Sequence, residues 1–172
     1  MKRSILSLTV LSVVLFSVPA FAASTNTTFQ VSASVIANCT ITASNLAFGN
    51  YDPVVANNTT GADLYANSTV TVACTKGAPN VWIGLDAGAN SASAVGTTRA
   101  MATGGNFLSY ELYTANPNPV AGAVWGNTQA TGKSYVPASK AATAITVFGR
   151  VPKGQDAAAG NYTDTITATI NY

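Results

Sequence analysis

Apolar side chains recur at every second position along much of this chain, and this alternation limits what the chain can fold into. A period of two is the period of a β-strand with one buried face, and no stretch keeps a helical period. Loops rich in Gly, Asn and Pro separate the alternating segments at the spacing of a β-sandwich. We therefore expect an all-β fold of short antiparallel strands, with the clearest alternation in 69–74, 81–85, 108–112 and 145–151.

The turns between the strands can also be placed. The pair Gly104-Gly105 is expected to fold the segment 99–102 back onto 108–112 as a hairpin. After a turn at 157–161 the alternation resumes in a last strand from Thr163, whose apolar positions are Ile166, Ala168, Ile170 and Tyr172. The sequence stops inside this strand, so we expect a sandwich that lacks its closing strand. Such a sandwich exposes an apolar groove and an unpaired edge, which soluble proteins normally avoid.

The first 22 residues have the features of a secretory signal peptide. Lys2 and Arg3 precede an apolar run over 5–18, and Ala20-Phe21-Ala22 is a small-x-small cleavage site. The run is short for a bilayer, which needs about 20 residues, and this argues against an uncleaved anchor. We expect 1–22 to be removed, and the mature chain to be exported without inserting into a membrane.

The charged residues exclude several classes of function. Without the signal peptide, six basic residues balance six acidic ones, and the chain contains no His. A neutral surface without a basic cluster does not suit nucleic acid or anionic membranes. Without His, the Ser-His-Asp and Cys-His triads are impossible and zinc loses its commonest ligand. Asp52 and Asp63 flank an Asn-rich loop that could hold a metal or a sugar, but both lie in ordinary turn sequences. We expect no enzyme activity, no cofactor and no metal.

Two cysteines, Cys39 and Cys74, remain in the exported chain. An even number in an oxidising compartment predicts one disulfide, and only one pairing is possible. A redox or nucleophilic role is the alternative. Neither cysteine has a CxxC partner, a His or a basic neighbour to activate it, so a structural bond is favoured.

The segment that precedes the first cysteine also has a strand pattern. Thr27, Phe29, Val31, Ala33 and Val35 share one parity, and polar residues alternate with them. The simplest interpretation is a first strand of the chain's own sandwich. The other interpretation is a strand that completes a neighbouring molecule, since the expected sandwich is missing one.

Three motifs in the same chain resemble a known family. The segments 37–41, 46–52 and 160–172, in this order behind a signal peptide, resemble the spore coat protein U domain family, which includes the Csu-type pilins of archaic chaperone-usher pili. The resemblance implies an incomplete immunoglobulin-like sandwich, completed by a donor strand from a neighbouring subunit. It divides the chain into a signal peptide, 1–22, a donor strand extension, 23–36, and a pilin domain, 37–172.

The resemblance also implies roles for individual residues and partners. Phe29, Val31, Ala33 and Val35 would be the inward residues of the donor strand, with Thr27 as a possible fifth. The acceptor edge would include the last strand. The partners would be other copies of the chain, related pilus subunits, a periplasmic chaperone and an outer-membrane usher. The chain would pass through the periplasm to a surface pilus, or be secreted, and serve adhesion and biofilm formation.

A second class of function remains open: a secreted carbohydrate-binding or coat module that works as a monomer. Trp82, Trp125, Tyr113 and Tyr135 could act as stacking platforms for sugars if they were exposed. In a sandwich such aromatics are more often part of the core. A module of this kind would be a monomer that binds glycans, whereas a pilin would form chains.

Overall fold

The structure, a computed structural model, describes residues 21–94, 96–118 and 122–172. This part of the chain is all-β, as predicted: it has eight strands and a single short 3₁₀ turn, η1, at Ser91–Ser93. The strands are β1 (Cys39–Ala43), β2 (Leu64–Cys74), β3 (Trp82–Leu85), β4 (Arg99–Thr103), β5 (Asn106–Tyr113), β6 (Lys133–Ser134), β7 (Thr143–Val151) and β8 (Ala168–Asn171).

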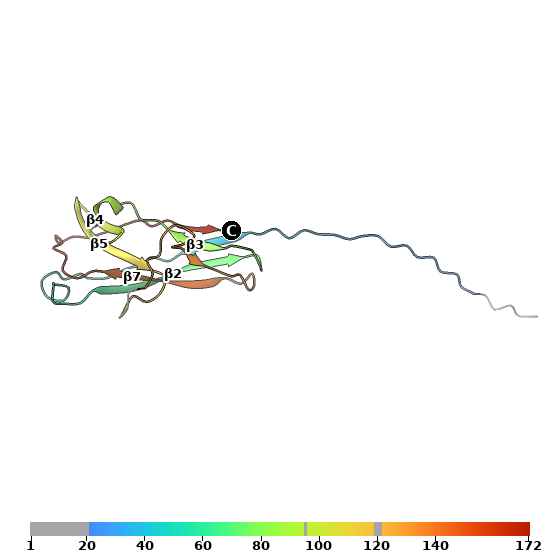
Figure 1. The fold of residues 1–172 in the computed structure, drawn as a ribbon, viewed down its shortest axis with the longest axis horizontal. Helices are drawn as coiled ribbons and strands as arrows, with labels where there is room; N and C mark the ends of the chain where they lie inside the picture. The colour runs from blue at the N-terminus through green and yellow to red at the C-terminus, as the bar shows by residue number, and fades with distance from the viewer. Residues whose placement is uncertain (1–20, 95, 119–121) are drawn as a thin grey trace, which may run out of the picture. The chain divides into compact units, whose positions relative to one another are not determined.

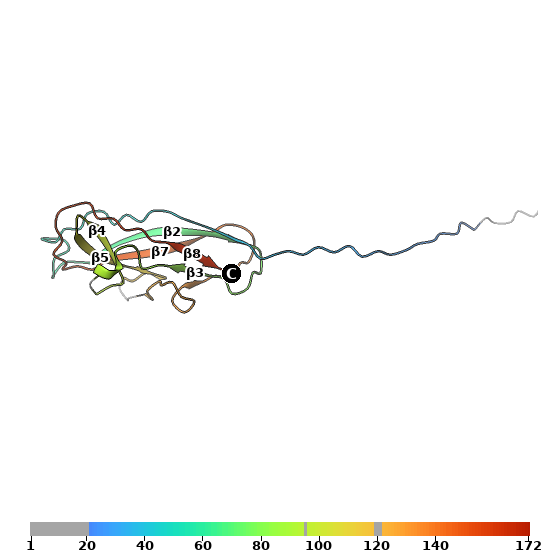
Figure 2. The same cartoon turned by 90° about the horizontal axis from the view of Figure 1, so that it is seen from above.

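The strands form two sheets (Figure 1). The larger sheet has the order β1-β2-β7-β5-β4 and the smaller has the order β6-β3-β8, with antiparallel pairing throughout. The view from above shows β2 beside β7 and β3 beside β8 (Figure 2). The predicted hairpin is confirmed: β4 and β5 are joined through Gly104 and Gly105, both of which have positive φ.

The core lies between the two sheets. Apolar side chains of the predicted parity fill it, because alternate residues of each strand point inward. Trp125 adds the largest buried side chain, and its indole N–H donates to the carbonyl of Ile83 at 2.8 Å. The buried cluster comprises Val70, Val72, Ile83, Leu85, Leu108, Tyr110, Leu112, Trp125, Val147 and Val151.

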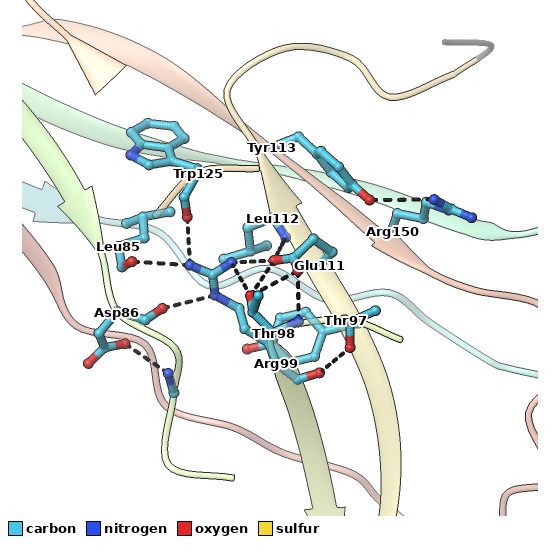
Figure 3. Close-up of polar contacts among 12 residues, drawn as sticks. Leu85, Asp86, Thr97, Thr98, Arg99, Glu111, Leu112, Tyr113, Trp125 and Arg150 are labelled. Carbon is cyan, nitrogen blue, oxygen red and sulfur yellow. Dashed lines mark hydrogen bonds and ion pairs between the residues drawn. The ribbon is translucent and has the colours of Figure 1, made fainter. Parts of the chain in front are cut away.

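A buried ion pair lies beside this core (Figure 3). The guanidinium of Arg99 pairs with the carboxylate of Glu111, and both side chains are almost fully buried. Arg99 also donates to the carbonyls of Leu85 at 3.1 Å, Asp86 at 2.9 Å and Trp125 at 2.6 Å. One arginine therefore holds β4 and β5 of the larger sheet to the end of β3 in the smaller.

The predicted disulfide joins Cys39 to Cys74, which face each other in the register of β1 and β2. The neighbouring Thr75 strengthens this end of the domain, because it exchanges backbone and side-chain hydrogen bonds with Asn38 at 2.9 and 3.1 Å. The disulfide thus holds β1 to β2 at the point where the N-terminal segment joins the domain.

Replacing both Cys39 and Cys74 by Ser is expected to lower the free energy of unfolding by about 3 kcal/mol. In the loop-entropy model the loss comes from freeing a loop of about 36 residues in the unfolded chain. Urea unfolding of the oxidised chain and the double variant measures the difference. Equal midpoints for the two proteins would contradict a stabilising role for the bond.

Residues 21–34 form a unit of their own and are described separately from Val35–Tyr172. No helix or strand occurs in 21–34 (Figure 1), and the side chains of Phe29 and Val31 are 85% and 83% exposed. The predicted signal peptide lies, except for its last two residues, outside the described part of the chain. Within the described part, no helix has the length and apolarity of a membrane span.

Candidate functional site

The two sheets each present an edge on the same side of the domain. β1 ends the larger sheet and β8 ends the smaller. Near the disulfide the edges converge, because Cys39 and Ile170 pack on the same small cluster of Cys74, Ala78 and Val81. The Tyr172 hydroxyl also donates to the side chain of Asn38 at 3.4 Å. This end of the space between the edges is therefore closed.

Backbone groups on both edges point into the space between them. Asp86 N–H donates to Thr167 at 3.1 Å, so the register of β3 and β8 leaves the backbone groups of Ala168 and Ile170 on the outer side. On the other edge, Ser44 N–H donates to the carbonyl of Thr69 at 2.9 Å. By the same alternation, the backbone N–H and C=O of Ile41 point away from β2. Both edges therefore carry backbone groups that an added strand can use, provided that β1 and β8, which contact each other here, move apart to admit it.

Beyond the two strands the edges diverge into a groove. Its walls are the segments 43–53 and 157–168, and two cavities of about 530 and 730 Å³ follow one another along it. The cavities share Leu46, Ala47, Phe48, Met101 and Tyr162. Its floor is formed by buried core residues: Val70, Leu85, Leu108, Tyr110, Leu112 and Val147.

The wall 43–53 is held against the larger sheet by one aromatic ring. Phe48 packs edge-on against Tyr110, with the ring centroids 5.9 Å apart. The ring also lies over Gly149, where a Cβ would come within 2.8 Å of the Phe48 Cζ atom. A glycine at this position of β7 therefore leaves room for the Phe48 ring to approach the sheet.

The chemistry of the groove is that of a surface for an extended apolar segment. Among the described residues that line it, Asp164 is the one with a charged side chain. That carboxylate accepts the Tyr110 hydroxyl at 2.8 Å. Burial, and then this hydrogen bond, raise the pKa of Tyr110 above its ordinary value of 10.0. No group of three or more His, Cys, Asp or Glu side chains in the described residues could hold a metal ion.

The last strand is shorter than predicted. Ala168 and Ile170 lie in β8, but Ile166 precedes the strand and Tyr172 follows it. Residues 163–167 are not a strand because the chain changes partners there: Thr163 forms a bridge with Ala102 of β4, whereas Thr167 bonds to Asp86 beyond β3. Ile166 and Ala168 line the groove.

The predicted donor residues lie outside any strand of this structure. Phe29, Val31 and Val35 are 83% to 85% exposed, and Thr27 and Ala33 are exposed as well. These residues have the alternation of a strand, but a strand forms only when it has a partner strand for its backbone hydrogen bonds. Their role as a donor strand therefore stays a prediction.

Most of the residues considered for the alternative functions have a structural role. Trp125 and Tyr113 are buried, so they cannot serve as exposed sugar platforms, and Trp82 and Tyr135 are half-buried. Asp52 accepts the backbone N–H groups of Val54 and Val55 at 2.9 and 3.0 Å. Asp63 pairs with Arg150 at 2.7 Å. Both aspartates thus act as structural acceptors.

Sequence reasoning missed two parts of this arrangement. Glu111 has the parity of an outward-facing residue, yet it is buried with Arg99. For Asp164 the sequence leaves a turn residue and a recognition role open, and gives no sign of its hydrogen bonds to Ala89 and Tyr110. The signal that could have found Glu111 is the predicted hairpin, which places Arg99 opposite Tyr110, the residue next to Glu111.

Acid is expected to destabilise the domain below about pH 4. Backbone N–H groups of Val55 and Val54 lower the pKa of Asp52 below 3.8. Burial raises the pKa of Asp63 and Asp86, but hydrogen bonds from Lys153 and Thr167 outweigh it, so both lie below 3.8. Because the unfolded chain then binds more protons, these groups stabilise the fold above about pH 4 and lose this effect as the pH falls through their folded pKa values.

Urea midpoints measured between about pH 2 and pH 8 test this expectation. They should be level from about pH 5 to 8, since no His titrates there, and fall below about pH 4. Asp63→Asn and Asp86→Asn should each make the acid fall shallower. A midpoint that is unchanged at pH 2 would contradict the assigned hydrogen bonds.

Comparison with known proteins agrees with this fold. The sequence profile of the Spore Coat Protein U domain matches residues 25–169. The chain belongs to the Spore Coat Protein U domain family. Protein U of Myxococcus xanthus is 36% identical over 169 residues, which cover 94% of this chain and 92% of that protein. The predicted family is therefore confirmed, and it is a family of structural proteins rather than enzymes.

A solved structure shares the fold of this Spore Coat Protein U domain. It is the crystal structure of the CsuC-CsuE chaperone-tip adhesion subunit pre-assembly complex from the archaic chaperone-usher Csu pili of Acinetobacter baumannii. One chain of that complex superposes with a TM-score of 0.50 and 19% identity, over 80% of this chain. The match spans 40% of the length of that chain, and at this identity it shows the fold.

Proposed function

We propose that this Spore Coat Protein U domain chain is a structural subunit of an archaic chaperone-usher pilus and assembles by donor-strand complementation. One observation carries the proposal: the same chain has an uncovered apolar groove between two sheet edges and an exposed segment with the alternation of the missing strand. Neither feature is useful to a lone domain. Together they form two halves of one interface between copies.

The dimensions and chemistry of the two halves agree. Residues 27–35, if extended, span about 30 Å and place their apolar side chains on one face. That face would cover the floor of the groove, while the backbone pairs with β1 and β8. Phe29, Val31 and Val35 would each contribute about 1.5 to 3 kcal/mol by leaving water, and Ala33 less. The ladder hydrogen bonds add to this.

The assembly that follows is a filament. The donor segment and the acceptor groove are different surfaces, so contacts between copies are head-to-tail and do not close into a ring. An apolar groove that is open in the monomer needs protection before assembly. A periplasmic chaperone can supply a temporary strand, and an outer-membrane usher can exchange it for the segment of the next subunit. The filament would lie on the cell surface and serve adhesion and biofilm formation.

A peptide experiment tests the proposal. A chain that lacks residues 23–34 is expected to have a low thermal midpoint, and a synthetic peptide of residues 23–36 should raise it by several degrees or more, because binding to the folded state alone stabilises it. A peptide with the same composition in scrambled order is the control. A truncated chain that melts at high temperature and ignores the peptide would indicate a complete sandwich. It would point instead to a coat or carbohydrate-binding module that works as a monomer.

A further inference from the structure

The wall of the groove that precedes β8 is built where the chain crosses from one sheet to the other. Thr163 exchanges backbone hydrogen bonds with Ala102 of β4 at 2.9 and 3.1 Å. Four residues later Thr167 accepts from Asp86 N–H at 3.1 Å and donates to its carboxylate at 2.9 Å. Between these two anchors, the segment 164–166 belongs to neither ladder. Two of its residues, Asp164 and Ile166, line the groove.

One side chain fixes this crossing segment. The carboxylate of Asp164 accepts three hydrogen bonds: from Ala89 N–H at 2.9 Å, from the Asn90 amide at 3.1 Å and from the Tyr110 hydroxyl at 2.8 Å. Ala89 and Asn90 lie in the loop after β3, and Tyr110 lies in β5. The carboxylate is therefore bonded to both sheets, and it is itself part of the groove lining.

The surroundings of this carboxylate suit an aspartate and little else. Gly88 has positive φ, and a Cβ at this position would collide with the Asp164 carboxylate. A carboxylate only accepts hydrogen bonds, so it can face three donors at once. Asparagine has the same shape but would turn an amide N–H₂ toward at least one of them. The carboxylate therefore suits these three donors better than an amide of the same volume.

We propose that Asp164 is a positioning residue for strand acceptance: it holds the wall of residues 162–166 so that the groove is already shaped for a donor strand. This inference rests on the proposed function, since it assigns a specificity role within the same groove. Without the carboxylate the crossing segment is anchored at its two ends alone. An incoming donor strand must then order the crossing segment, and the entropy lost in this ordering lowers the affinity of the groove for the strand.

The chain offers a matched control for this role. Asp63 also accepts three hydrogen bonds, from Arg150 at 2.7 Å, Lys153 N–H at 2.9 Å and the Tyr65 hydroxyl at 3.2 Å. It does not line the groove. Asp63→Asn should therefore lower stability as Asp164→Asn does, but leave strand acceptance intact. Asn90→Ala, which removes one donor to Asp164, is a milder variant that keeps the test usable if Asp164→Asn does not fold.

The experiment uses the mature chain, residues 23–172, with Phe29→Asp in every variant to keep it monomeric, and a fluorescent peptide of the native residues 23–36. Thermal midpoints are measured without peptide and the Kd by anisotropy. We expect Asp164→Asn to weaken the peptide at least about 10-fold and Asn90→Ala about 3-fold, whereas Asp63→Asn stays within about 2-fold at a similar loss of midpoint. Equal affinities for Asp164→Asn and Asp63→Asn would overturn the inference while leaving strand donation intact. A native chain that binds no peptide would overturn both.

Discussion

Replacing Glu111 by Gln is expected to lower the free energy of unfolding by about 3 to 5 kcal/mol, the cost of leaving a buried charge without its partner. Glutamine keeps the shape of the side chain, so the change isolates the charge of the pair. Arg99 is 1% exposed and cannot reach water in the folded domain. Since a domain has about 5 to 15 kcal/mol in total, this loss is a large share of its stability. Urea unfolding followed by tryptophan fluorescence measures the loss.

The control is the other ion pair of the domain. Arg150 and Asp63 are 31% and 16% exposed, so Arg150→Gln should cost at most about 1 kcal/mol, because solvent screens the pair. A loss for Glu111→Gln no larger than that for Arg150→Gln would show that the buried pair does not hold the sheets together.

The double variant Arg99→Leu and Glu111→Leu distinguishes two accounts of this pair. A simple buried ion pair can often be replaced by apolar residues without loss. Here Arg99 also supplies donors to the carbonyls of Leu85, Asp86 and Trp125, and leucine leaves all three without them. We therefore expect the double variant to remain well below the native chain in stability. Full recovery would mean that the link between the sheets is unimportant.

The alternation of the sequence predicted the strands well because it reports which side chains face the core. It placed the hairpin at Gly104 and Gly105, and the residues it assigned to the core in β2 and β5 are buried, although β5 also buries Ser109, Glu111 and Tyr113. The disulfide followed from the number of cysteines. These features depend on local patterns, which a single sequence records directly.

The features that the sequence did not predict depend on tertiary contacts. Glu111 has the parity of a solvent-facing residue, but Arg99, which the hairpin places opposite the adjacent Tyr110, makes its burial possible. Thr and apolar residues alternate through 165–170, yet the chain crosses from β4 to the end of β3 between Thr163 and Thr167. A period of two indicates that a segment can form a strand, but it does not show which strand the segment pairs with.

The same limit explains the N-terminal segment and gives the second large prediction. Residues 27–35 have a strand pattern without a strand in this structure, as expected if their partner is another copy. Phe29→Asp should then abolish filament assembly by the mature chain, because it removes the largest apolar side chain of the donor face and puts a charge into an apolar groove. Burial of phenylalanine alone is worth about 1.5 to 3 kcal/mol, and the buried charge adds more, so affinity should fall at least about 100-fold.

Gln30→Asp is the matched control, since it introduces the same charge one position away on the opposite face of the donor strand. Size-exclusion chromatography and electron microscopy of the two variants, each with the native groove, measure assembly. Phe29→Asp should remain monomeric, whereas Gln30→Asp should form filaments as the native chain does. Loss of assembly in both variants would assign the segment a role that depends on charge rather than on parity. Assembly by both variants would show that residues 27–35 are not part of the interface, because a strand with one buried face does not tolerate an aspartate on that face.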